Sequence, residues 1–88
     1  MSRDVDAVIA ALKVVLKEAE ERQSEGGWWP VTTVNRWIGR LPGADDGLWD
    51  KLILEGDEDG TAEARDILMH ARATIAYLEA NRDGITGA

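Results

Sequence analysis

Apolar residues recur at steps of three and four in two long segments of this chain. Val5, Val8, Ile9, Leu12, Val15, Leu16 and Ala19 form the first series, and Ala64, Ile67, Leu68, Ala71, Ile75 and Leu78 form the second. This spacing places the apolar side chains on one face of an α-helix. Two amphipathic helices are therefore the main constraint on how the 88 residues can fold.

Two shorter segments between them also have helical spacing. Pro30 suits a first helical turn, and Pro42-Gly43 ends the segment that follows it. Strand signals are weak, because no alternating run or hairpin dipeptide stands out. The pattern predicts an all-α fold, a small single-domain bundle (residues 1–88) of about four helices. We expect helices at 3–24, 30–41, 45–55 and 61–82, with the two long ones at the ends of the chain.

The chain is short and has no cysteine, so its core is thin and has no disulfide bond to stabilise it. A domain of this size buries about 60% of the surface that its unfolded chain exposes. Such a chain relies on helix packing, oligomerisation or a partner. Ala7, Ala11 and Val14 widen the first apolar stripe, which indicates contacts on two sides of that helix and keeps a homodimer as an alternative. The N-terminus has no signal-peptide pattern and no segment has the roughly 20 apolar residues of a membrane span, so we predict a cytoplasmic protein without membrane contact.

The net charge of −7 is spread unevenly. Residues 44–66 alone carry −7, whereas residues 26–43 carry +2 from Arg36 and Arg40. A pI near 4.5 disfavours nucleic acid and anionic membranes as partners. One histidine and no cysteine leave no catalytic constellation, so we predict no enzyme, no catalytic residue and no cofactor. We expect His70 to pair with Asp66, one helical turn before it.

Three of the four tryptophans lie in residues 26–43. Trp37 and Trp49 fall on the inner stripes of their helices and are predicted to be core. Trp28 and Trp29 are consecutive at a helix entrance, so at least one of them is expected to be exposed. Tryptophan and arginine are enriched at binding hot spots. The first candidate partner-binding surface is therefore a Trp/Arg patch of Trp28, Trp29, Arg36 and Arg40; the alternative is a tryptophan stapled over the following helix.

The second candidate surface is an acidic face. Complementary potentials steer association, so such a face fits a basic groove, including one that normally holds nucleic acid. Its members are Asp45, Asp46, Asp50, Glu55, Asp57, Glu58, Asp59, Glu63 and Asp66.

The segment EGDEDGTAEARD, residues 55–66, resembles an EF-hand calcium loop. With Gly60 at the sixth position, oxygen-bearing side chains fall at the alternating ligand positions. The candidate calcium ligands are Glu55, Asp57, Asp59, Thr61 and Asp66, with Glu63 at the ninth position. The segment departs from the pattern at both ends, since Glu replaces Asp at the first position and Asp replaces the bidentate Glu at the twelfth. A solvated acidic turn is the alternative.

Residues 32–41, TTVNRWIGRL, are similar to the second helix of a helix-turn-helix. The segment before them is longer than the usual turn, and the acidic flanks would repel DNA. A DNA-binding regulator is therefore a further alternative, beside a short core helix with two outward arginines.

Together these features favour a small acidic, non-catalytic regulator or inhibitor that binds another protein. It would act through the acidic face, the Trp/Arg patch or both. In general character, as a short, acidic, cysteine-free helical chain, it resembles phage-borne antagonists such as anti-CRISPR proteins, without sharing a motif with them. The alternatives are a calcium-binding helix-loop-helix at residues 55–66 and a DNA-binding regulator.

Overall fold

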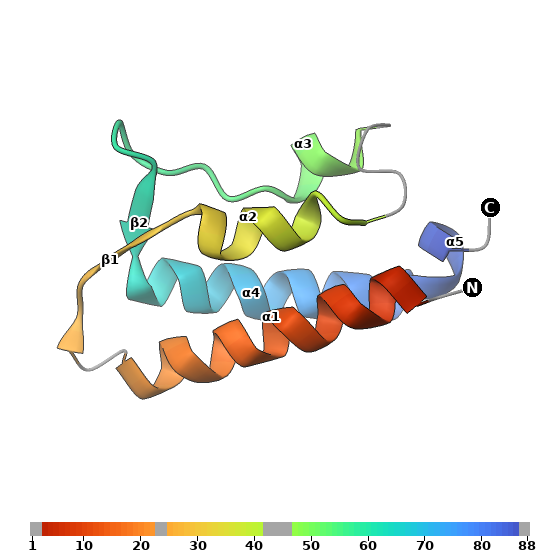
Figure 1. The fold of residues 1–88 in the computed structure, drawn as a ribbon, viewed down its shortest axis with the longest axis horizontal. Coiled ribbons are helices and arrows are strands. Elements are labelled where there is room, and N and C mark those ends of the chain that lie inside the picture. Colours follow the sequence, from red (N-terminus) through yellow and green to blue (C-terminus); the bar gives the residue numbers. More distant parts are fainter. Residues whose placement is uncertain (1–2, 23–24, 42–46, 87–88) are drawn as a thin grey trace.

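A computed structural model describes residues 3–22, 25–41 and 47–86 of the chain (Figure 1). Its elements, in chain order, are α1 (Arg3–Arg22), β1 (Trp28–Pro30), α2 (Thr32–Ile38), α3 (Leu48–Leu52), β2 (Thr61–Glu63), α4 (Ala64–Ala80) and α5 (Arg82–Thr86). The predicted, mostly helical architecture is confirmed. No helix in the described ranges is long and apolar enough to cross a membrane.

The two long helices, α1 and α4, lie side by side and run in opposite directions (Figure 1). Their facing stripes supply most of the core, in which Leu12, Ile67 and Leu78 are fully buried. Exposed ion pairs cross the same contact, but such pairs contribute at most about 1 kcal/mol each, so apolar burial dominates it. The pairs between α1 and α4 are Lys13–Glu79 (3.4 Å) and Glu20–Arg72 (3.7 Å), and their order follows the antiparallel arrangement. A third pair, Asp6–Arg82 (3.1 Å), joins α1 to α5.

The short helix α2 lies over the α1–α4 pair and buries Val34 and Ile38 against it. The chain from α3 to β2 runs across the outer side of α2 and returns to the start of α4 (Figure 1). This middle part of the chain therefore forms an outer layer on the two long helices.

The helix boundaries differ from those predicted. The helices expected at 30–41 and 45–55 are shorter, at Thr32–Ile38 and Leu48–Leu52, and residues 45 and 46 lie outside the described residues. The helix expected at 61–82 begins at Ala64 and is followed by the separate α5. The first helix is described from Arg3 to Arg22, and residues 23 and 24 lie outside the described residues. Purely all-α was wrong, because Pro30 and Thr61 belong to strands instead of starting helices.

The small sheet pairs β1 and β2 in antiparallel register, with Trp28 opposite Glu63, Trp29 opposite Ala62 and Pro30 opposite Thr61. Burial of Ala62 and partial burial of Trp29 attach the sheet to the core. The strands are far apart in the sequence and no hairpin turn joins them, so no local sequence signal predicts their pairing. Gly27 and Gly60 beside them have positive φ angles, which glycine adopts without steric strain.

A buried amide, Asn35, fixes the segment that follows α3. Its Nδ2 donates to the Leu54 carbonyl and its Oδ1 accepts from the Leu54 N–H, both at 2.9 Å. Asn35 lies on α2 with only 7% of its surface exposed. One side chain therefore satisfies both backbone groups of an irregular segment, as a neighbouring strand would.

We expect Asn35→Ala to lower the free energy of unfolding by about 2–3 kcal/mol, because it leaves the backbone groups of Leu54 without partners in a partly buried place. Asn81→Ala is the matched control. Asn81 also donates from Nδ2 to a backbone carbonyl, that of Tyr77 at 2.9 Å, but it is exposed. Urea unfolding followed by circular dichroism measures both. Equal losses in the two variants would contradict the role given to Asn35.

Candidate protein-binding groove

One stripe of α1 stays uncovered. Ala7 and Val14 are exposed and Ala11 is half-buried, with 59% of the Val14 surface open to solvent. The sequence predicted that these residues widen the apolar face of the first helix. In the structure α4 covers the main stripe, and this second stripe forms one wall of a groove whose other wall is α2.

Trp37 forms the floor of this groove, between two arginines. The guanidinium carbon of Arg36 lies 5.3 Å from the centroid of the Trp37 ring, and that of Arg40 lies 4.9 Å from it. Both are within cation–π range. Trp37 was predicted to be core and is instead half-buried. Within the part of the chain that the structure describes, neither arginine forms an ion pair.

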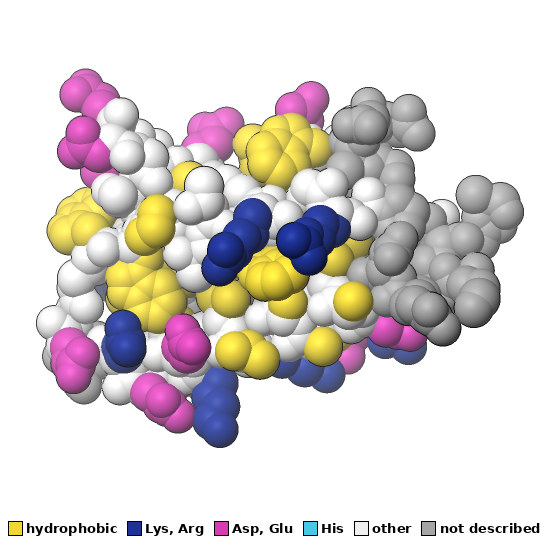
Figure 2. Space-filling model, in the orientation of Figure 1, with side chains coloured by type: hydrophobic (Ala, Val, Ile, Leu, Met, Phe, Trp, Pro, Cys, Tyr) yellow, Lys and Arg dark blue, Asp and Glu magenta, His cyan; other side chains and the backbone are white. Residues whose placement is uncertain are grey.

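Three adjoining hollows make up the groove. The middle one has a volume of about 350 Å³ and lies between Val14 and Trp37. It shares Trp37 with a hollow of about 120 Å³ beside Ala7 and Arg40. It shares Glu18 and Thr33 with one of about 280 Å³ that reaches Trp28 and Trp29. We call these three adjoining hollows together the α1–α2 groove. Figure 2 shows this face of the molecule, with basic side chains over a hydrophobic patch along α2 and further hydrophobic side chains below them.

All four residues of the predicted Trp/Arg patch lie along this groove. The expectation that one of the consecutive tryptophans is exposed is confirmed, because Trp28 is 60% exposed while Trp29 packs against the core. Trp49 was predicted to be core and is exposed at 37%, with its ring against Gly39. It lies on α3, which belongs to the outer layer rather than to the core.

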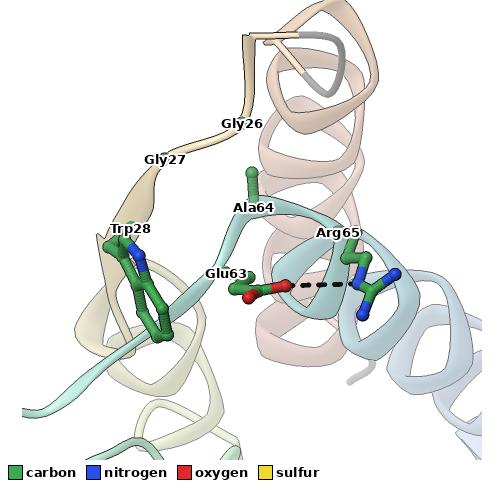
Figure 3. Close-up of a pocket in the computed structure, with 6 residues that line it drawn as sticks. All are labelled: Gly26, Gly27, Trp28, Glu63, Ala64 and Arg65. Carbon is green, nitrogen blue, oxygen red and sulfur yellow. Dashed lines mark ion pairs between the residues drawn. The ribbon is translucent and has the colours of Figure 1, made fainter.

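A separate hollow of about 320 Å³ lies where β2 passes into α4 (Figure 3). Gly26, Gly27 and Trp28 line one side of it, and Glu63 and Arg65 the other. Arg65 Nε and Glu63 Oε2 are 3.2 Å apart, so the two charges compensate each other. Among its described lining residues, the charges therefore balance.

The predicted acidic face is spread over several elements. Asp50 is exposed on α3, and Glu55, Asp57, Glu58 and Asp59 are exposed on the segment before β2. Glu63 is half-buried and paired with Arg65, and Asp66 is exposed in the first turn of α4. Asp45 and Asp46 lie outside the described residues. The continuous acidic part is therefore residues 55–59.

The structure does not support the calcium loop. Asp57 directs its carboxylate at its own turn, where Oδ1 accepts from the Asp59 N–H (2.9 Å), the Thr61 N–H (3.0 Å) and the Thr61 hydroxyl (2.9 Å). These hydrogen bonds, above all that from the Thr61 N–H, lower the pKa of Asp57. No group of three or more His, Cys, Asp or Glu side chains in the described ranges could hold a metal ion, although Glu55, Asp57, Asp59, Thr61 and Asp66 are all among them. In this structure the segment is an acidic turn fixed by the carboxylate of Asp57.

The helix-turn-helix resemblance also lacks the first helix of the motif, which would precede α2 after a short turn. The element directly before α2 is the strand β1, not a helix. Arg36 and Arg40, which point outward as the short-helix alternative expected, lie over Trp37.

The expected pair between His70 and Asp66 is wrong. His70 Nε2 lies 2.7 Å from the Leu52 carbonyl oxygen, so the ring donates a hydrogen bond across to the end of α3. This contact and the Asn35–Leu54 pair hold the outer layer at adjacent points. Burial lowers the pKa of His70 below its ordinary value, and the carbonyl only partly opposes that shift.

Comparisons with family models, with curated proteins and with solved structures found no match for this chain. The evidence about function is therefore the geometry of the groove and of the acidic turn.

Neutral His70 should make the stability of the chain pH-dependent. Because its pKa is lowered on folding, the unfolded chain binds the proton more readily, so this contribution is complete above about pH 6.5 and is lost as the pH falls below it. We expect the wild type to lose more free energy of unfolding between about pH 8 and pH 5 than His70→Gln, by at most about 1.4 kcal/mol per pH unit. Glutamine stays neutral and keeps an N–H donor for Leu52. Identical pH profiles from urea unfolding would contradict this.

Proposed function

We propose that this chain is a small, non-catalytic protein-binding regulator or inhibitor that holds its partner in the α1–α2 groove. The observation that carries the proposal is the uncovered stripe of Ala7, Ala11 and Val14 beside a tryptophan flanked by two arginines. A small domain with a thin core gains stability by covering apolar surface, yet here that surface is left open. Exposed apolar patches with a polar rim are typical of interaction sites.

The composition of the groove supports the same proposal. Aromatic residues and arginine are over-represented among the residues that dominate binding energy. The cation–π contacts hold Arg36 and Arg40 over the ring, so less side-chain freedom is lost when a partner arrives. A half-buried tryptophan also presents a large area that is already positioned.

The acidic turn at residues 55–59 supports a second candidate, the binding of a basic groove on another protein. Asp57 fixes the turn from within, and Glu55, Glu58 and Asp59 remain exposed on it. This candidate would use a surface different from the α1–α2 groove, so the two can be separated by position.

Photo-crosslinking in the producing cell tests these candidates. A crosslinking amino acid is placed at Val14 in the groove, at Met69 on α4 or at Glu58 on the acidic turn. Val14 and Met69 are matched in exposure, at 59% and 62%. We expect a protein adduct from Val14 but not from Met69, and its loss when Arg36→Glu and Arg40→Glu are added.

An adduct from Glu58 alone would show that the partner binds at the acidic turn and not in the α1–α2 groove. Equal adducts from Val14 and Met69 would mean non-specific capture and would contradict the proposal. Circular dichroism of each variant checks that the fold is retained.

A further inference from the structure

We infer that the occupant of the α1–α2 groove is an α-helix of another protein that carries carboxylates beside its apolar stripe. This rests on the proposed function and specifies the chemistry of the partner. The inference joins three observations: the spacing of the uncovered residues, the helical backbone of the walls and, on one rim, two arginines that form no ion pair with any described residue.

The uncovered stripe has the spacing at which a helix receives another helix. Ala7, Ala11, Val14 and Glu18 follow one another at steps of four, three and four, the steps of a coiled-coil seam. Three of the four are apolar, and the fourth marks the end of the apolar part. The span from Ala7 to Arg22 is about 22 Å along α1, because a helix rises about 1.5 Å per residue. A helix of about 15 residues therefore matches the groove in length.

The walls favour a helix over an extended segment. In the middle hollow both walls are helices, α1 and α2, whose interior backbone groups bond within the helix. An extended occupant would find few backbone partners there, and unpaired backbone groups are costly when buried. A helix satisfies its own backbone and presents only side chains to the groove.

The rim sets the charge of the occupant. Arg36 and Arg40 stand on the α2 side and form no ion pair within the described ranges. Carboxylates on the facing side of the occupant would pair with them while its apolar residues contact Trp37 and Val14. This local preference opposes the net charge of −7, which on its own would attract a basic partner. The two effects can therefore be told apart.

Designed peptides of about 15 residues test the inference. The first has leucines at coiled-coil spacing and flanking glutamates; the second has lysines in place of the glutamates; the third keeps the glutamates but has serines in place of the leucines. Binding is measured by titration into ¹⁵N-labelled protein, with the Trp37 indole N–H as reporter. We expect the glutamate peptide to bind at least about 10-fold more tightly than either of the others at physiological salt.

Charge reversal provides the control within the protein. Arg36→Glu/Arg40→Glu should invert the preference between the glutamate and lysine peptides. Arg65→Glu/Arg72→Glu changes the net charge equally at exposed arginines that do not line the groove, and should leave the preference for glutamate unchanged. A preference for the lysine peptide in the wild type, or inversion in both variants, would show that net charge decides and would overturn the inference.

Two further outcomes would also overturn it. One is a dimer in light scattering that Val14→Arg converts to a monomer, since a second copy would then fill the groove. The other is binding of a DNA duplex that is lost in Arg36→Glu/Arg40→Glu but not in Arg65→Glu/Arg72→Glu. If no peptide binds while the Val14 crosslink forms, the inference fails and the proposed function stands. If a crosslinker at Val14 gives no adduct in the otherwise unchanged protein, the proposed function itself fails.

Discussion

The antiparallel contact between α1 and α4 is the interaction on which the other elements depend. It contains most of the fully buried large side chains, and α2, α5 and both strands contact one or both of these helices, whereas α3 lies on the outer side of α2. The middle of the chain is attached to the long helices through Val34 and Ile38 of α2 and through His70 of α4, which bonds to the Leu52 carbonyl. Asn35 of α2 in turn holds the backbone of Leu54. Polar anchors of this kind are specific in geometry, so they fix a path for a segment that has little regular structure.

The same contact explains why a groove exists. A helix packed against one neighbour hides one stripe, but α1 carries apolar residues on a wider arc. The short α2 covers only part of the remainder. The groove is therefore the space left between a broad apolar face and a short covering helix, with Trp37 filling its floor. The net charge of the chain and the charge of this groove have opposite signs, which makes the groove a local exception on an acidic surface.

Sequence periodicity was sufficient to predict the elements whose hydrogen bonds join residues close together in the sequence, which are the two long helices. The stripes from Val5 to Ala19 and from Ala64 to Leu78 identified α1 and α4, because helical spacing is a local signal. The sheet was missed because its pairing joins Trp29 to Ala62, which no local pattern links. His70 was paired with Asp66 for the same reason: its true partner, the Leu52 carbonyl, comes from a distant backbone segment. For the site, the sequence was sufficient to predict that Trp28, Arg36 and Arg40 belong to a binding surface. It was also sufficient to predict that the first helix has a wide apolar face. The place of Trp37 in the same surface could not be predicted, because it depends on the short α2 covering only part of the apolar face of α1.

Pro30 has a consequence for how copies of this chain behave when crowded together. A two-stranded sheet ends in open edges, and an open edge is a template on which further strands can grow. Proline has no N–H to offer to such a neighbour, and strands of three residues give it little length to follow. The exposed indole of Trp28 therefore stands next to a backbone that resists propagation. At this edge the large aromatic surface of Trp28 is therefore combined with a poor template for a further strand.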